Sequence, residues 1–293
     1  MVVVLVTEMW IEPKELEMTN EWRLKVFHQY TADTRVVFVH PKFWKSKLPA
    51  CDYKGLEDFE CVTCEFADDV WGQTWQNECA LKYVMSLNVS DSGAIIMHAD
   101  SWFTHKLLRN IEQHPDALAV ARDRGEDWSH WHWQTAHTWH WPKYKTRIYK
   151  TLRLFPEIQI RGGWADIFYI PKPSWQYLLP YFTAFRETGV MNEIAWLSSA
   201  MTVRDLHNMS LRNLGCSGGC CRKELPTTHS MCGHKWDMTK HADSIQLLKS
   251  YRPSSRLLRR RLQSSTSPSF QVSSVCVLCF LLFVLAKIFI KRQ

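Results

Sequence analysis

Residues 2–10 read VVVLVTEMW, and this stretch decides the fold class. A continuous run of apolar, mostly β-branched residues is typical of a strand that is buried on both faces of a parallel sheet. Two further runs have the same character: residues 34–40 (TRVVFVH), closed by Pro41, and residues 93–98 (GAIIMH). The chain therefore begins with the buried strands of an α/β domain.

Helical patterns alternate with these strands. Apolar residues at helical spacing predict helices over residues 75–85 and 103–113, and residues 21–29 also look helical. Residues 117–121 predict one more strand. This alternation predicts an α/β layer fold with a mostly parallel sheet flanked by helices. Ligands of such sheets bind at the carboxyl ends of the strands.

The composition is that of a globular protein and excludes fibres and full disorder. The chain has 293 residues, of which 46% are hydrophobic and 22% are charged. Its net charge is +7, but residues 244–293 hold nine basic residues and no acid, so the remainder carries −2. A body of that charge is not a polyanion binder, and we expect no nucleic-acid partner.

The basic C-terminal part predicts a membrane anchor. Residues 272–290 (VSSVCVLCFLLFVLAKIFI) contain one charge and are long enough to span a bilayer, although a buried core helix is the alternative. Residues 246–271 form a basic, Ser/Pro-rich linker. We expect a single-pass C-terminal anchor in the endoplasmic reticulum or Golgi. Five Arg precede it, against Lys287 near its end and Lys291 and Arg292 after it, which favours a cytosolic body.

Eight cysteines outside the anchor fall into two groups of four, which are Cys51, Cys61, Cys64 and Cys79, and then Cys216, Cys220, Cys221 and Cys232. In a reducing cytosol they would be thiols or ligands of a structural Zn²⁺, and in a lumen they would be disulfides. The second group and His234 could make a zinc knuckle. The sequons at Asn88 and Asn208 would matter only in a lumen.

A candidate metal site follows the strand at residues 93–98. Asp100 is positioned to hold a hard divalent cation that bridges phosphate oxygens, with His98 as a second ligand. The alternative is that Asp100 only caps the helix beginning near Phe103. The first strand also ends at polar residues, Thr7 and Glu8. The candidate cofactor-binding residues are these two, together with Asp100 and Trp102 after the strand at residues 93–98.

Four segments together carry a family resemblance: the buried N-terminal strand, GAIIMHAD, residues 162–171 (GGWADIFYIP) and residues 191–201 (MNEIAWLSSAM). In this order they resemble nucleotide-sugar glycosyltransferases of the GT-A fold, over about residues 1–243. Those enzymes carry an Asp-X-Asp motif that binds the metal and the sugar diphosphate. Here His98 stands at the first position of that motif.

The resemblance implies a site and a division of the chain. It implies Mn²⁺ or Mg²⁺ as cofactor, with His234 completing the metal ligands, Asp166 as an acid that contacts the sugar, and Glu193 as the catalytic base. It makes residues 1–245 a glycosyltransferase-like domain, with a nucleotide-sugar half (1–123) and an acceptor half (124–245). The alternatives are that Asp166 caps a turn before a strand and that Glu193 is a first-turn acid favoured by the helix dipole.

Residues 127–144 (DWSHWHWQTAHTWHWPKY) hold five Trp and four His. Indole rings stack on the flat C–H faces of sugars, so we interpret the segment as an acceptor-binding platform. The candidate acceptor-binding residues are Asp127, Trp128, Trp131, Trp133, Gly163 and Trp164. A Trp-rich loop packed on the core, a His-rich metal site and insertion into a membrane interface are the alternatives.

Together these features predict a membrane-anchored glycosyltransferase that transfers a sugar from a nucleotide diphosphate donor to a glycan, glycoprotein or glycolipid acceptor. The alternative is a catalytically inactive glycosyltransferase-like protein that binds carbohydrate or a partner. A zinc-dependent hydrolase that uses the histidine cluster is a third, weaker hypothesis.

Overall fold

The computed structural model describes residues 2–7, 34–41, 59–64, 74–87, 93–98, 101–122, 141–190, 192–216 and 231–234. All of them belong to one compact unit, Met1–Ser250. A second unit, Tyr251–Gln293, holds the predicted anchor and most of the predicted linker, and it lies outside the described residues.

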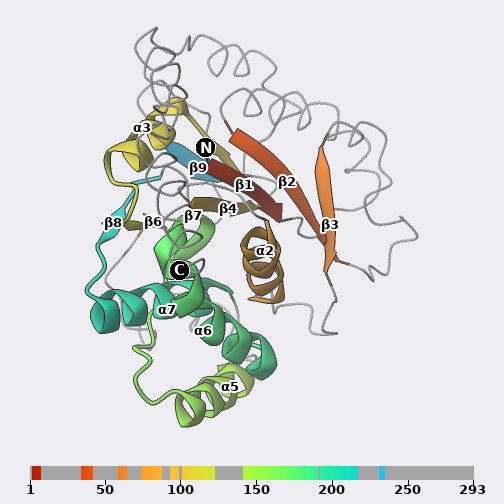
Figure 1. Ribbon diagram of the computed structural model, residues 1–293. Coiled ribbons are helices and arrows are strands. Elements are labelled where there is room, and N and C mark those ends of the chain that lie inside the picture. Colours follow the sequence, from red (N-terminus) through yellow and green to blue (C-terminus); the bar gives the residue numbers. More distant parts are fainter. Residues whose placement is uncertain are drawn as a thin grey trace, which may run out of the picture. The chain divides into compact units, whose positions relative to one another are not determined.

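A seven-stranded sheet forms the centre of the unit, in the order β3-β2-β1-β4-β7-β6-β8 (Figure 1). Its strands are β1 (Val2–Thr7), β2 (Thr34–Pro41), β3 (Glu60–Cys64), β4 (Gly93–His98), β6 (Leu118–Arg122), β7 (Trp164–Pro171) and β8 (Leu211–Asn213). All pairs are parallel except those that β7 makes with β4 and β6. The predicted α/β fold with a mostly parallel sheet is therefore confirmed.

Helices cover both faces of this sheet. They are α2 (Thr74–Ser86), α3 (His105–Gln113), α5 (Trp141–Leu154), α6 (Trp175–Thr188) and α7 (Asn192–His207), and a short 3₁₀ turn, η2 (Lys172–Ser174), leads into α6. A small two-stranded sheet pairs β5 (Ser101–Phe103) with β9 (Cys232–His234).

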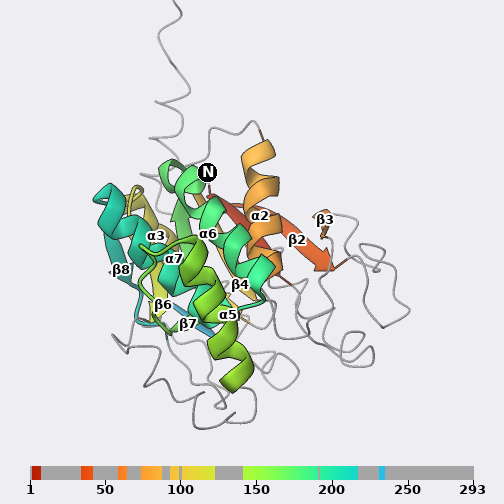
Figure 2. The same cartoon turned by 90° about the horizontal axis from the view of Figure 1, so that it is seen from below.

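The alternation of side chains along β1 separates two cores. Val3 and Leu5 pack in a cluster with residues of α2, α5, α6 and α7, whereas Val4 and Val6 pack with residues of α3, β5 and β9. All six residues of β1 are buried, because helices or strands cover both of its faces. Seen from below, the four helices of the first cluster lie over one face, with α3 behind the sheet (Figure 2).

Most predicted elements match the observed ones closely. The strand predicted over 93–98 is β4, the strand at 34–40 is β2 with one more residue, the strand at 117–121 is β6, and the helix at 75–85 is α2. The first strand ends at Thr7, and residues 8–10 lie outside the described residues, as does the helix predicted over 21–29.

The helix predicted over 103–113 begins later than expected. Phe103 belongs to β5, where it pairs with Cys232 of β9, and α3 begins at His105. The N-cap is Thr104, whose Oγ1 accepts a hydrogen bond from the Lys106 amide at 3.3 Å. The alternative role of Asp100 as the cap of this helix is therefore wrong, because Thr104 supplies the capping oxygen.

The predicted acceptor half completes the sheet of the predicted nucleotide-sugar half. β7 lies between β4 and β6, so residues 164–171 are hydrogen-bonded on both sides to strands from the first 123 residues. The two predicted halves consequently share one continuous sheet.

Two disulfides tie the described elements together. Cys64 of β3 is bonded to Cys79 of α2, and Cys216, just after β8, is bonded to Cys232 of β9. Cys61 is disulfide-bonded as well. Because Cys216 and Cys232 are bonded to each other, neither is a thiolate that a zinc knuckle could use, and structural Zn²⁺ elsewhere stays a prediction.

Within the described residues, no helix combines the length and the apolar character needed to cross a bilayer. The segment predicted to do so, residues 272–290, lies outside the part of the chain that the structure describes.

Candidate functional site

The carboxyl ends of β1 and β4 lie side by side. The parallel register pairs Thr7 with His98, and the Thr7 hydroxyl donates a hydrogen bond to the Met97 carbonyl oxygen at 3.1 Å. Thr7 lies two residues after Leu5, and His98 lies two residues after Ile96, both of which pack in the cluster with α2 and α7. Because alternate residues of a strand face the same side, Thr7 and His98 face that side as well. Two of the predicted site residues therefore meet at the edge where ligands of α/β sheets bind.

Asp166 joins this edge from β7. The antiparallel register of β4 and β7 ends with Met97 opposite Ile167, and His98 and Asp166 follow immediately. His98 Nδ1 lies 3.2 Å from Asp166 Oδ1, with 4% of the histidine side chain and 15% of the aspartate side chain exposed. Since Asp166 lies inside β7, its alternative role as a cap of a turn before the strand is wrong.

An irregularity in β7 orients Asp166. β6 and β7 pair at Val120 with Phe168, and then at Arg122 with Trp164, so β7 has extra residues around Asp166. Ala165 packs in the cluster with α7 and Ile167 in the cluster with α3, although alternate residues of a regular strand face the same side. Bulges of this kind redirect side chains and are common beside active sites.

A hydrogen bond from β5 holds the backbone of Asp166 in place. The Ser101 hydroxyl donates to the Asp166 carbonyl oxygen at 3.1 Å, which links β5 to β7. Ser101 also pairs with His234 in the β5–β9 sheet. The backbone of His234, the predicted third metal ligand, therefore lies opposite a residue that contacts Asp166. The His234 side chain lies outside the described residues.

The first turn of α7 is fixed to the segment that enters β7. The Gly163 amide donates to the Glu193 carbonyl oxygen at 3.0 Å, and Asn192 Nδ2 donates to the Ala165 carbonyl oxygen at 3.4 Å. Asn77 Nδ2 of α2 donates in turn to Asn192 Oδ1. The predicted base Glu193 thus stands on a rigid backbone, with a partly exposed side chain.

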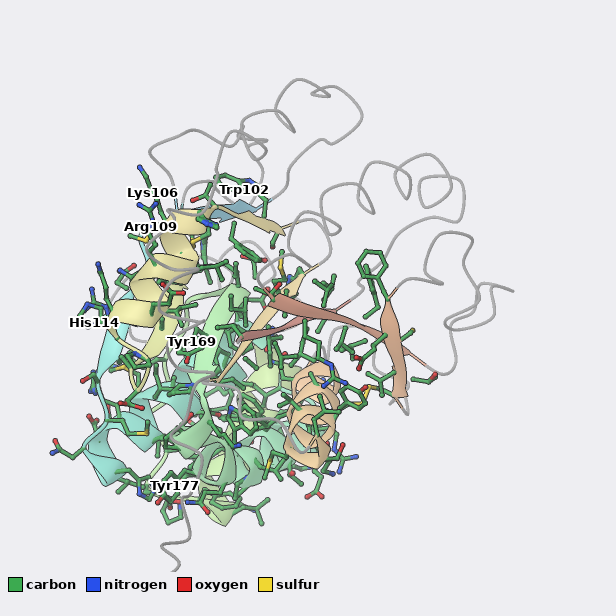
Figure 3. All side chains as sticks on the ribbon, turned by 45° about the horizontal axis from the view of Figure 1, so that its top comes forward. Trp102, Lys106, Arg109, His114, Tyr169 and Tyr177 are labelled. Carbon is green, nitrogen blue, oxygen red and sulfur yellow. A yellow bond between two sulfur atoms is a disulfide. The ribbon has the colours of Figure 1, made fainter. Side chains whose placement is uncertain are left out.

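Three predicted ligand-binding residues are buried. Trp102 has no exposed surface, Trp164 packs in the cluster on the α3 face, and Gly163 lies beneath the start of α7. A Cβ on Gly233 would lie 2.4 Å from Trp102 Cζ2, so the backbone of β9 rests directly on that indole. Trp102 lies beside β9, while Lys106 and Arg109 project outward from α3 (Figure 3).

Six predicted site residues lie outside the described residues, and these are Glu8, Asp100, Asp127, Trp128, Trp131 and Trp133. Of the Trp-rich segment 127–144, the structure describes the last four residues, which begin α5 at Trp141. The acceptor platform therefore stays a prediction.

The sequence analysis did not select Ser101 and Asn192, which hydrogen-bond to the strand that carries Asp166. Each is adjacent to a predicted feature: Ser101 follows His98-Ala-Asp100, and Asn192 precedes Glu193. A polar residue next to a predicted catalytic acid, at the start of an element with an apolar pattern, is the signal that could have found Asn192.

Two tyrosines near the core stay protonated. Burial raises the pKa of Tyr169, and its hydroxyl donates to the Pro115 carbonyl oxygen at 2.9 Å. Burial, followed by the nearby Glu157 carboxylate, raises the pKa of Tyr181 to about 12. Both hydroxyls are therefore hydrogen-bond donors at neutral pH.

His98 and Asp166 at the sheet edge are residue types that divalent cations accept as ligands. An imidazole whose one nitrogen lies beside a carboxylate is oriented so that its other nitrogen can ligate a metal. His98 and Asp166 have this relationship, although no group of three or more His, Cys, Asp or Glu that could hold a metal occurs among the described residues. Asp100 and the imidazole of His234, the two remaining predicted ligands, lie outside them.

No family model and no curated protein matches the chain. Among solved structures, the galactosyltransferase LgtC in complex with donor and acceptor sugar analogues is similar over 87% of this chain and 98% of its own, with 8% identity and a TM-score of 0.42. A glycosyltransferase involved in the glycosylation of the major capsid of PBCV-1 is similar over 86% of this chain and all of its own, with 8% identity and a TM-score of 0.39.

Mouse xyloside xylosyltransferase 1, in its apo form, is similar over 84% of this chain and 93% of its own, with 10% identity and a TM-score of 0.33. All three neighbours are glycosyltransferases. At these identities and scores, the argument for a function rests on the site itself.

Proposed function

We propose that this chain is a glycosyltransferase that moves a sugar from a nucleotide diphosphate donor to a glycan, protein or lipid acceptor. The observation that carries the proposal is the meeting of Thr7, His98 and Asp166 at one edge of the sheet, with 3.2 Å between His98 Nδ1 and Asp166 Oδ1. All three were candidate site residues in the sequence, and the fold brings two with different expected roles, His98 and Asp166, into contact.

His98 and Asp166 support a donor site of the following kind. Asp166 would orient the imidazole through Nδ1, and Nε2 of His98, together with Asp100 and His234, would hold a divalent cation. When bound, Mn²⁺ or Mg²⁺ would neutralise the charge of the diphosphate leaving group. The bulge in β7 and the hydrogen bond from Ser101 hold Asp166 in position for this task.

Glu193 is the proposed base. Transfer to an acceptor hydroxyl needs a group that takes the hydroxyl proton as the new bond forms. Glu193 has a partly exposed carboxylate in the first turn of α7, and its backbone is tied to Gly163. A rigid backbone limits the reorganisation that the carboxylate needs before it reacts.

The anchor belongs to the same proposal. Residues 272–290 would hold the enzyme in the membrane of the endoplasmic reticulum or Golgi, where lipid-linked and protein-linked acceptors are presented. The support is the length and apolar character of the segment and its basic flanks.

The test is an activity screen of the purified full-length chain in detergent with a panel of nucleotide sugars, with and without Mn²⁺. The proposal expects metal-dependent release of a nucleoside diphosphate from one donor. Asp166→Asn should lower that release at least tenfold, and Glu193→Gln should lower transfer while donor binding is kept. Glu187→Gln removes an exposed carboxylate on α6 and is the matched control.

The alternative of an inactive binding protein makes a different prediction. It expects glycan binding that is indifferent to Mn²⁺ and to Asp166→Asn, and that is lost in the double variant Trp131→Ala and Trp133→Ala. A folded chain that consumes no nucleotide sugar but binds glycans in this way would overturn the enzyme proposal.

A further inference from the structure

The turn after α7 carries a modifiable asparagine. Asn208, Met209 and Ser210 form an Asn-X-Ser sequon, and the middle residue is not proline. Both Asn208 and Ser210 are exposed. Asn208 has a φ of 51°, the left-handed conformation that asparagine adopts more readily than most residues.

The backbone of this turn is fixed and Met209 packs against the core, while the side chains of Asn208 and Ser210 are exposed. The Met209 amide donates to the Arg204 carbonyl oxygen at 3.0 Å, and the Leu118 amide donates to the Ser210 carbonyl oxygen at 2.9 Å. Within the described residues, the Asn208 side chain makes no hydrogen bond. A bulky group on Asn208 Nδ2 would therefore extend into solvent and break neither of these backbone hydrogen bonds.

The disulfides indicate the compartment in which the body folds. Cys64 is bonded to Cys79, and Cys216 to Cys232, and Cys61 is also in a disulfide. Such bonds form and persist in the secretory pathway and are rare in the cytosol. The count of flanking charges favoured a cytosolic body, but the bonded cysteines favour a lumenal one.

We propose that Asn208 is an N-glycosylation site, modified in the lumen of the endoplasmic reticulum. The donor is an oligosaccharide linked through its reducing-end C1 to a lipid diphosphate. A bond forms between Asn208 Nδ2 and that C1, the bond from C1 to the diphosphate oxygen breaks, Nδ2 gives up one proton, and the lipid diphosphate leaves. The Ser210 hydroxyl completes the recognition sequence.

The glycan would lie away from the candidate donor site. Asn208 follows the last residue of α7, whereas Glu193 is in the first turn of the same helix. A helix of 16 residues is about 24 Å long at 1.5 Å per residue. Glycosylation at Asn208 should consequently leave ligand access to the sheet edge unchanged.

The test compares electrophoretic mobility of the full-length chain made in human cells, before and after treatment with an endoglycosidase that cleaves N-glycans. All variants carry Asn88→Gln, so that the second sequon does not contribute. The proposal expects a shift of one glycan in this background, removed by the enzyme and absent from Asn208→Gln and Ser210→Ala.

Ser210→Thr is the matched control, because it keeps the recognition sequence and should keep the shift. Ser210→Ala leaves Asn208 and its left-handed turn intact, so loss of the shift there does not reflect a broken cap. Equal mobility of the Asn88→Gln and the Asn88→Gln, Asn208→Gln chains, before and after the endoglycosidase, would overturn the proposal.

Discussion

His98 Nδ1 lies 3.2 Å from Asp166 Oδ1, across the ends of two antiparallel neighbours in an otherwise mostly parallel sheet. This contact depends on β7 entering the sheet between β4 and β6, and on the bulge that turns Asp166 toward β4. A histidine at that position would be an ordinary buried side chain without the aspartate. With the aspartate, it is a buried imidazole within ion-pairing distance of a carboxylate.

The contact between Gly233 and Trp102 gives the first prediction. We expect Gly233→Ala to lower the free energy of unfolding by about 3 kcal/mol, the upper part of the range for overpacking, because the new Cβ would meet the rigid indole. Combining it with Trp102→Leu should recover part of the loss. Denaturant unfolding of the two single variants and the double variant measures this, and strictly additive losses would contradict it.

The disulfides give the second prediction. Their sequence separations are 15 and 16 residues, and a loop of that size predicts a stabilisation of about 3 kcal/mol for each bond. The paired variants Cys64→Ala, Cys79→Ala and Cys216→Ala, Cys232→Ala should each unfold at a lower temperature than the oxidised chain. Thermal unfolding that is unchanged by both pairs of substitutions and by reductant would refute this.

The buried carboxylate of Glu78 gives the third prediction. It contacts Arg186 Nε, lies 2.7 Å from Lys82 Nζ and accepts a hydrogen bond from Thr183 Oγ1 at 2.8 Å. Arg186→Ala should lower the free energy of unfolding by about 1.5 kcal/mol, because it removes one charged partner of a buried carboxylate that keeps Lys82 and Thr183. Arg204→Ala breaks the exposed pair with Asp205 and, as the control, should change stability by less than about 1 kcal/mol.

The contact between Arg35 and Glu60 gives the fourth prediction, on pH. The Arg35 guanidinium, which bonds both carboxylate oxygens at 2.6 and 2.7 Å, holds the pKa of Glu60 below its ordinary value, and a hydrogen bond from Tyr83 acts in the same direction. A lowered pKa means that the stabilisation is present at neutral pH and is lost as the pH falls through the folded-state value.

Glu60→Gln should therefore be less stable than the wild type at pH 7, by about 1 kcal/mol for a partly exposed pair. The difference should shrink as the pH falls below the ordinary glutamate value of 4.5. Chemical denaturation of both chains at several pH values measures it. A difference that is constant from pH 7 to pH 3 would show that the ion pair is not its source.

The sequence predicted the buried strands well and the site only in outline. Residues 93–98 form a strand because their apolar run lies at the centre of the sheet, where local pattern and burial agree. Phe103 was predicted in a helix, yet it pairs with Cys232, and a pairing over that sequence distance leaves no local pattern. The edge strand β3 is only partly buried, and the sequence analysis missed it for that reason.

The contact between His98 and Asp166 could not be predicted from the sequence, for a similar reason. Each residue was selected on its own segment, but the bulge in β7 that joins them depends on its register with β6. A register is set by packing across the whole sheet, and one segment does not encode it. The disulfide pairing was equally undetermined, because four cysteines in a group allow three connectivities.

The proposed function requires that the sheet edge formed by Thr7, His98 and Asp166 binds a nucleoside diphosphate together with a divalent cation. The most direct measurement is the thermal unfolding of the full-length chain with uridine, guanosine, adenosine and cytidine diphosphates, with and without Mn²⁺. Wild type is compared with His98→Gln, Asp166→Asn and the control Glu187→Gln. At a hundredfold excess over the dissociation constant, binding would add about 2.7 kcal/mol of stability.

We expect one nucleotide to raise the unfolding temperature only when Mn²⁺ is present. We expect His98→Gln and Asp166→Asn to lose this shift and Glu187→Gln to keep it. Folded wild-type protein that responds to no nucleotide, or a metal-dependent shift that survives both substitutions at the His98–Asp166 contact, would contradict the claim.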